Sequence, residues 1–124
     1  MTLYMVIVDF HGEATSEKVA MGRYLDGRVS AVLGTHTHIP TADHHILAGG
    51  TGYMSDVGMT GSYDSVIGMK EKSVMSRFLT RMPSRFEPAS GPATLAGVVI
   101  RVGRGDGLCR DILPIRRGGI LERR

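Results

Sequence analysis

Two short apolar runs on either side of one helical segment constrain the fold of this chain more than any other feature. Residues 3–9 and 28–33 are dominated by apolar side chains, which predicts two buried strands. Residues 16–26 between them follow Thr15, a favourable helix N-cap, and precede Gly27, a favourable helix end. A strand, a helix and a strand with short connections predict a βαβ unit with parallel strands. The chain is therefore expected to be an α/β protein.

The remaining segments predict a mixed sheet in a single domain. In chain order they are a strand at 45–48, a glycine-rich loop at 49–68, a helix at 70–82 and two strands at 94–102 and 108–115. An apolar stripe recurs at the helical period on the second helix and predicts a packing face; it consists of Val74, Met75, Phe78, Leu79 and Met82. The last two strands flank a glycine-rich turn and are expected to close the sheet as an antiparallel hairpin. No linker or internal repeat divides residues 1–124.

Histidines follow each of the first two predicted strands. His11 comes after the first, and His36 and His38 come after the second. Because the carboxyl ends of neighbouring parallel strands lie at one edge of a sheet, these imidazoles are expected to converge there. Neutral imidazole is a good ligand for Zn, Fe, Mn or Co, so the pattern indicates a metal site. A single histidine at a strand end is, however, more often a structural residue than a ligand, so spacing alone favours neither alternative.

Three long blocks of the chain closely resemble the YmdB-type bacterial metallophosphoesterases. The blocks are DFHGEATSEK at 9–18, GTHTHIPTAD at 34–43 and GTGYMSDVGMTGSYDSVIG at 50–68. The resemblance implies part of a calcineurin-like αββα sandwich, an enzyme that hydrolyses phosphodiesters such as cyclic AMP or 2′,3′-cyclic nucleotides with a hydroxide activated by two metals. It also implies that His11 and His36 ligate one metal and His38 the other. The metals are expected to be Fe or Mn, with Zn as an alternative.

The same resemblance implies that the chain corresponds to the C-terminal half of the enzyme. The family's earlier segments supply a bridging carboxylate, further metal ligands and the histidine that protonates the leaving group. No catalytic acid is therefore assigned here, the N-terminal half is the expected partner, and the chain alone is expected to lack activity. A sheet edge left open by the missing half favours homo-oligomers. The alternative is a non-catalytic α/β module that binds metal or self-associates.

Six other polar residues in the matched blocks are candidates for orienting a metal ligand or shaping a substrate loop. They are Asp9, Thr35, Asp56, Thr60, Tyr63 and Asp64. Asp9 could orient His11 or cap the following turn. The polar residues of the glycine-rich block could face a phosphate, but anchoring the loop is the favoured role. His44 and His45 fall outside the matched positions and are expected to be exposed.

Composition excludes several other classes of protein. The net charge of +3 comes largely from arginines in the last quarter of the chain, but no aromatic platform accompanies them, so a solvated surface is favoured over nucleic-acid binding. No apolar run has the length of a membrane span or a signal peptide, so a cytoplasmic protein is expected. The one cysteine, Cys109, is expected to be a small buried hydrophobe. No P-loop, dinucleotide fingerprint or nucleophile elbow is present.

Overall fold

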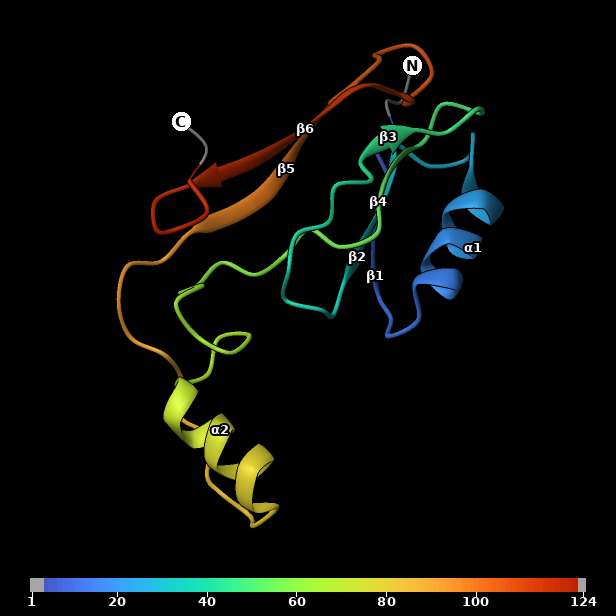
Figure 1. The fold of residues 1–124 in the computed structure, drawn as a ribbon. Helices are drawn as coiled ribbons and strands as arrows, with labels where there is room; N and C mark the ends of the chain where they lie inside the picture. The colour runs from blue at the N-terminus through green and yellow to red at the C-terminus, as the bar shows by residue number, and fades with distance from the viewer. Residues whose placement is uncertain (1–3, 123–124) are drawn as a thin grey trace.

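The computed structural model, which describes residues 4–122, is a mixed α/β fold with two sheets. Four strands form one sheet in the order β1-β2-β4-β3, and β5 and β6 form a second sheet (Figure 1). The elements are β1 (Ile7–His11), α1 (Thr15–Leu25), β2 (Ala31–Thr35), β3 (His45–Ile46), β4 (Gly52–Met54), α2 (Glu71–Thr80), β5 (Leu95–Val102) and β6 (Cys109–Arg117).

The βαβ unit expected from the sequence is confirmed. Strands β1 and β2 are parallel, with Ile7 opposite Ala31 and His11 opposite Thr35. Both strands start later than predicted, and Leu3 of the first predicted strand lies outside the described residues. Ahead of the ladder, the Val6 N–H donates to the Ser30 hydroxyl at 3.1 Å, so a side chain replaces the strand carbonyl as the partner.

The prediction for the start of α1 is wrong in detail. The residue that caps the helix is Ala14, no side chain caps it, and Thr15 is already helical. The prediction for its end is confirmed, because Gly27 follows the helix with φ +80. Gly27 donates its N–H to the Thr51 hydroxyl at 2.9 Å, which ties the end of the helix to the segment that leads into β4.

Strand β4 lies in the glycine-rich block that was expected to be loop. It is parallel to β2 and antiparallel to β3, and its Tyr53 and Met54 are 3% and 0% exposed. The glycine in this strand allows close packing: a Cβ added at Gly52 would lie 2.9 Å from the sulfur of Cys109. The glycine content therefore marks a crowded part of the core here, not a flexible turn.

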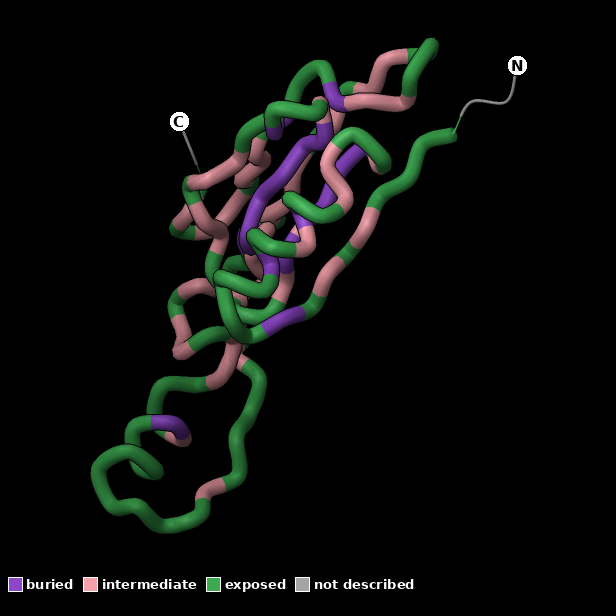
Figure 2. Tube along the Cα trace, turned by 90° about the vertical axis from the view of Figure 1, so that its right-hand side faces the viewer, coloured by how far each residue is buried: buried purple, intermediate pink, exposed green. Residues whose placement is uncertain are grey.

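The two faces of the four-stranded sheet are covered by different elements. Helix α1 lies on one side and the β5–β6 hairpin on the other (Figure 1). The buried residues concentrate in the sheet between them (Figure 2). One core cluster holds Val32, Leu47 and Tyr53 with partly buried residues of α1, and the other holds Met54, Cys109 and Ile112 with partly buried residues of β5. The expected burial of Cys109 is confirmed.

The C-terminal hairpin is confirmed, but its place in the fold is not as predicted. Strands β5 and β6 pair antiparallel, with Leu95 opposite Arg117. The hairpin does not extend the first sheet; instead β6 contacts β3 and β4 across the face of that sheet. Burying the apolar residues Cys109 and Ile112 against this face requires the hairpin to stack on the sheet.

Helix α2 stands apart from the sheet (Figure 1). Its predicted packing face is wrong within the described residues, since Phe78 and Leu79 are 74% and 77% exposed and only Val74 is buried. The helix ends at Thr80 because Arg81 adopts a left-handed conformation, before Pro83 is reached. No helix within residues 4–122 has the length and apolar character needed to cross a membrane.

Candidate functional site

The carboxyl ends of β1, β2 and β4 bring three loops to one edge of the sheet. His11 is the last residue of β1, His36 follows β2, and Asp56 lies two residues beyond β4. The three strands are parallel, so their ends lie together. The Val57 N–H donates to the Gly34 carbonyl at 2.9 Å and joins the loops after β2 and β4. This edge is where α/β sheets bind ligands.

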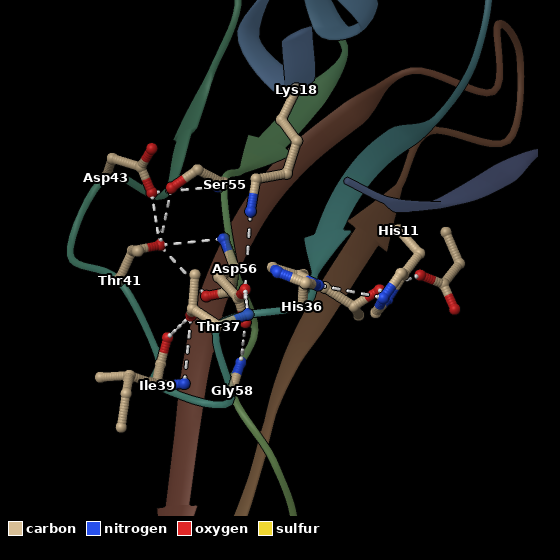
Figure 3. A network of polar contacts seen from close by, with 12 residues as sticks. His11, Lys18, His36, Thr37, Ile39, Thr41, Asp43, Ser55, Asp56 and Gly58 are labelled. Carbon is tan, nitrogen blue, oxygen red and sulfur yellow. Dashed lines mark hydrogen bonds and ion pairs between the residues drawn. The ribbon is translucent and has the colours of Figure 1, made fainter. Parts of the chain in front are cut away.

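His11 and His36 meet at this edge, as expected from the sequence. His36 Nδ1 lies 3.2 Å from His11 Nε2, with the rings edge to face at 77° (Figure 3). Two nitrogen ligands of one ion, each about 2.0–2.1 Å from it, would lie about 2.9–3.4 Å apart. The spacing of the two imidazoles therefore fits the shared coordination of one metal ion.

A short polar relay sets the orientation of His11. The Thr35 hydroxyl donates to Asp9 Oδ1 at 3.0 Å and lies 3.1 Å from His11 Nδ1. The single hydroxyl hydrogen of Thr35 is donated to Asp9, so towards His11 the Thr35 oxygen acts as the acceptor. His11 therefore carries its hydrogen on Nδ1, and its lone pair is on Nε2. A hydrogen bond of this kind on the far nitrogen is typical of metal-ligating histidines. Asp9 and Thr35 therefore act on His11 together.

His38 is not brought into the same group. Its Nδ1 lies 2.8 Å from the carbonyl oxygen of Ile67, which receives the ring hydrogen and leaves Nε2 free to accept. Among residues 4–122 no three His, Cys, Asp or Glu side chains gather closely enough to hold one ion. Each of the two sites expected for metals therefore has fewer than three ligands from this part of the chain.

An apolar cavity of about 470 Å³ adjoins His38. It is lined by His38, Val66, Ile67, Met69, Val74, Arg77, Phe78 and Phe86. The guanidinium of Arg77 lies 4.0 Å above the ring of Phe86. The cavity has the volume of a small-ligand pocket but offers few hydrogen-bonding groups.

The loop that carries His36 and His38 has an unusual backbone. His36 has φ 146 and His38 has φ 66, a region that non-glycine residues rarely adopt. The residue between them, Thr37, donates its N–H to Asp56 Oδ2 at 2.7 Å (Figure 3). Asp56 Oδ1 accepts the Gly58 N–H at 2.9 Å, so one carboxylate joins both loops. Such conformations persist where the surrounding structure holds them.

The Asp56 carboxylate faces a buried lysine. Lys18 of α1 is 1% exposed, and its Nζ lies 3.6 Å from Asp56 Oδ2 (Figure 3). Lys18 is not among the residues expected from the sequence, because a lysine usually lies on the solvated face of a helix. The signal was nevertheless present: Lys18, Met21, Gly22 and Leu25 recur at the helical period, and all four are buried or partly buried.

A second polar cluster supports the same loops from the other side. The Thr41 hydroxyl lies 2.7 Å from Asp43 Oδ1 and 3.1 Å from the Asp56 N–H, and the Ser55 N–H donates to Asp43 (Figure 3). Partial burial works to raise the pKa of Asp43, but the hydrogen bonds from Ser55 and Thr41 outweigh it and lower that pKa. Thr41, Asp43 and Ser55 are also not among the residues expected from the sequence, because short polar side chains in loops show no periodicity.

The other predicted residues lie elsewhere. The Tyr63 hydroxyl donates to the Met59 carbonyl and accepts the Met59 N–H, which fits the anchoring role favoured for this block. The Thr60 hydroxyl is 3.4 Å from the Ala96 carbonyl, and Asp64 is exposed. His45 is exposed as expected, but His44 is half-buried, contrary to expectation.

Replacing His36 by alanine is expected to change the stability of the metal-free chain by less than about 1 kcal/mol. His36 is an exposed loop residue, and such substitutions usually have small effects. Met54→Ala is the control, because Met54 is 0% exposed and its truncation should cost about 2–5 kcal/mol. Urea unfolding of the two variants measures both values; a His36→Ala loss as large as that of Met54→Ala would make His36 a core residue.

Known proteins similar to this chain agree with the resemblance drawn from the sequence. The family model described as YmdB-like protein matches residues 1–115. The chain belongs to the YmdB-like family. It is 57% identical over 97 residues to the 2′,3′-cyclic-nucleotide 2′-phosphodiesterase of Bacillus subtilis strain 168, a match that covers 78% of this chain and 37% of that protein.

Two solved structures share the fold. A hypothetical protein from Thermus thermophilus superposes with a TM-score of 0.83 at 46% identity, over 94% of this chain and 45% of that one. A novel phosphatase from Mycoplasma pneumoniae superposes with a TM-score of 0.87 at 38% identity, over 92% of this chain and 41% of that one. This chain thus spans less than half the length of each of these three proteins.

Proposed function

We propose that this chain forms the histidine-bearing side of a metal-dependent phosphodiesterase site that acts on 2′,3′-cyclic nucleotides or on cyclic AMP. The observation that carries the proposal is the 3.2 Å approach of His11 Nε2 and His36 Nδ1 at the carboxyl edge of a parallel sheet. The kinship with a 2′,3′-cyclic-nucleotide 2′-phosphodiesterase supports the choice of substrate. Fold and site together fit half of a calcineurin-like αββα sandwich.

The residues of this chain would hold two divalent ions, Fe or Mn with Zn as an alternative. His11 and His36 would bind one ion and His38 the other. When bound, the ions would stabilise the negative charge of the phosphoryl group and lower the pKa of the attacking water. Asp9 and Thr35 keep the His11 lone pair directed at the site, and the Ile67 carbonyl does the same for His38.

The remaining ligands and the acid that protonates the leaving group would come from the part of the enzyme that this chain does not cover, the N-terminal half that the resemblance implies. Strand β1 lies at the edge of the sheet and is available to pair with a further strand. Ile7, the first residue of β1, and Val6 just before it are 45% and 42% exposed, so they offer apolar surface to such a partner. A second copy of the chain could use the same edge.

A complementation assay tests the proposal. The chain would be assayed with 2′,3′-cyclic AMP and Mn²⁺, alone and together with the corresponding N-terminal region of the Bacillus subtilis relative. We expect turnover only for the mixture, and we expect a chelator to remove it. His36→Ala and His38→Ala should each lower turnover by more than about 100-fold. Loss of a group that only orients a metal ligand costs about 10- to 100-fold, and loss of a ligand itself should cost more.

His45→Ala is the matched control, because His45 is exposed and its Nδ1 interacts only with the backbone carbonyl of Asp43 among the described residues. Its turnover should equal that of the parent. Hydrolysis that survives the chelator and both histidine substitutions would contradict the proposal. A mixture that binds metal but never turns over would favour the alternative, a non-catalytic metal-binding module.

A further inference from the structure

The environment of Lys18 is unusual for a lysine. Its side chain is 2% exposed and runs from α1 across Gly34, where an added Cβ would lie 2.9 Å from Lys18 Cδ. Lysine is almost never fully buried unless it is paired. Among residues 4–122 the one ion-pair partner of Lys18 is Asp56, which is 1% exposed.

Asp56 in turn acts on the loop that bears the histidines. Both of its oxygens accept backbone N–H groups, from Thr37 at 2.7 Å and from Gly58 at 2.9 Å (Figure 3). Thr37 lies between His36 and His38, which both have positive φ. A backbone with two such residues needs outside support to keep one conformation. The bond from Thr37 to Asp56 supplies that support at the midpoint of the loop.

We propose that Lys18 is a positioning residue, whose buried ammonium holds the Asp56 carboxylate so that Asp56 fixes the Thr37 backbone and thereby the directions of the His36 and His38 imidazoles. The inference rests on the proposed function for its catalytic meaning, since it takes those imidazoles as metal ligands. Lys18 itself touches neither imidazole. Its effect passes through one carboxylate and one backbone amide.

The charge of Lys18 is what the arrangement requires. A buried carboxylate that accepts two N–H groups is costly to desolvate unless a cation lies nearby. The Lys18 ammonium forms an ion pair with Asp56 Oδ2 at 3.6 Å, while the same oxygen accepts the Thr37 N–H at 2.7 Å, because a carboxylate oxygen can interact with a cation and accept a hydrogen bond at once. Lys18 thus balances the charge of the carboxylate, while both of its oxygens accept backbone N–H groups.

The test compares Lys18→Met with the control Lys72→Met, each in the metal-free 124-residue chain. Lys72 is an exposed lysine of α2. Amide hydrogen exchange of Thr37 would be measured against that of Val32 in the core, and Co²⁺ binding would be followed by its visible absorption. In Lys18→Met the Asp56 carboxylate is no longer held, so its hydrogen bond with the Thr37 N–H should weaken. We expect Thr37 to exchange about tenfold faster or more relative to Val32, as when a hydrogen bond to a charged group is lost.

Cobalt binding by Lys18→Met should weaken about 10- to 100-fold, as when a group that orients a metal ligand is lost. Lys72→Met should leave both readings unchanged. A lower melting temperature of Lys18→Met with Thr37 exchange and Co²⁺ binding at parental values would overturn the proposal and leave Lys18 as a structural residue. A different outcome is possible, in which Lys18→Met speeds Thr37 exchange but His36→Ala leaves Co²⁺ binding at the parental value. That result would support the positioning of the loop by Lys18 and overturn the proposed metal site.

The double variant Lys18→Met/Asp56→Asn keeps the test decisive if Lys18→Met fails to fold. It buries no lone charge and retains an oxygen that can accept the Thr37 N–H. A neutral amide is a weaker acceptor than a carboxylate, so Thr37 should still exchange faster than in the parent. Parental protection of Thr37 in this variant would overturn the proposal.

Discussion

Replacing Gly34 by alanine is expected to destabilise the chain by more than about 3 kcal/mol, beyond the usual cost of an overpacked core. The new methyl group would overlap the carbonyl oxygen of Ser55 and would lie 2.6 Å from the Ser55 carbonyl carbon and 2.9 Å from Lys18 Cδ. Backbone atoms cannot move aside as a flexible side chain can. Strand β2 and the segment after β4 would have to separate, and urea unfolding would measure the loss.

Gly97→Ala in β5 is the matched control. No atom lies within 4 Å of a Cβ added at Gly97, and its φ is not in the positive region. The alanine should leave stability unchanged or raise it by about 0.5–1 kcal/mol, since it restricts the unfolded chain. A Gly34→Ala variant as stable as Gly97→Ala would show that β2 and the segment after β4 do not approach as closely as described.

Asp56→Ala is the second substitution with a large expected effect, a loss of about 3–5 kcal/mol in the free energy of unfolding. It leaves the buried Lys18 ammonium without its partner and removes the acceptors of the Thr37 and Gly58 N–H groups. Adding Lys18→Met should recover part of the loss, because the double variant no longer buries a lone charge. Urea unfolding of the single and double variants measures this coupling.

Asp111→Ala serves as the comparison for Asp56→Ala. Asp111 also pairs with a cation, at 3.3 Å from Arg101, but the two side chains are 53% and 76% exposed. An exposed pair contributes about 0–1 kcal/mol, so this variant should unfold close to the parent. Equal losses for Asp56→Ala and Asp111→Ala would contradict the importance given to burial.

The parts of the site that could be predicted are those encoded by chain order. His11 and His36 each follow a strand of one βαβ unit, and parallel pairing brings such positions together whatever the side chains between them. The relay through Asp9 and Thr35 was within reach for the same reason, since His11 and Thr35 pair directly across the two strands. The assignment of these histidines as metal ligands remains a prediction.

The parts that could not be predicted depend on contacts between segments far apart in the chain. The burial of Lys18 could not be predicted, because its partner Asp56 comes from another segment of the chain. A lysine without a known partner is assigned to the surface. His38 was expected beside the other histidines, but the Ile67 carbonyl holds its ring. That contact depends on the conformation of two loops, and loop conformations produce no periodic pattern in the sequence.

The sequence by itself determined the α/β class, the βαβ unit, the C-terminal hairpin and the edge at which His11 and His36 meet, because local periodicity and parallel order suffice for these. Only the tertiary structure decided that the block at 49–68 contains the buried strand β4, and that the hairpin stacks on the sheet instead of extending it. Both outcomes depend on which apolar faces of the sheet and the hairpin pack together in the folded chain. Gly52 illustrates the reason: it is read as a turn residue in isolation, but it accommodates Cys109 when the two sheets pack.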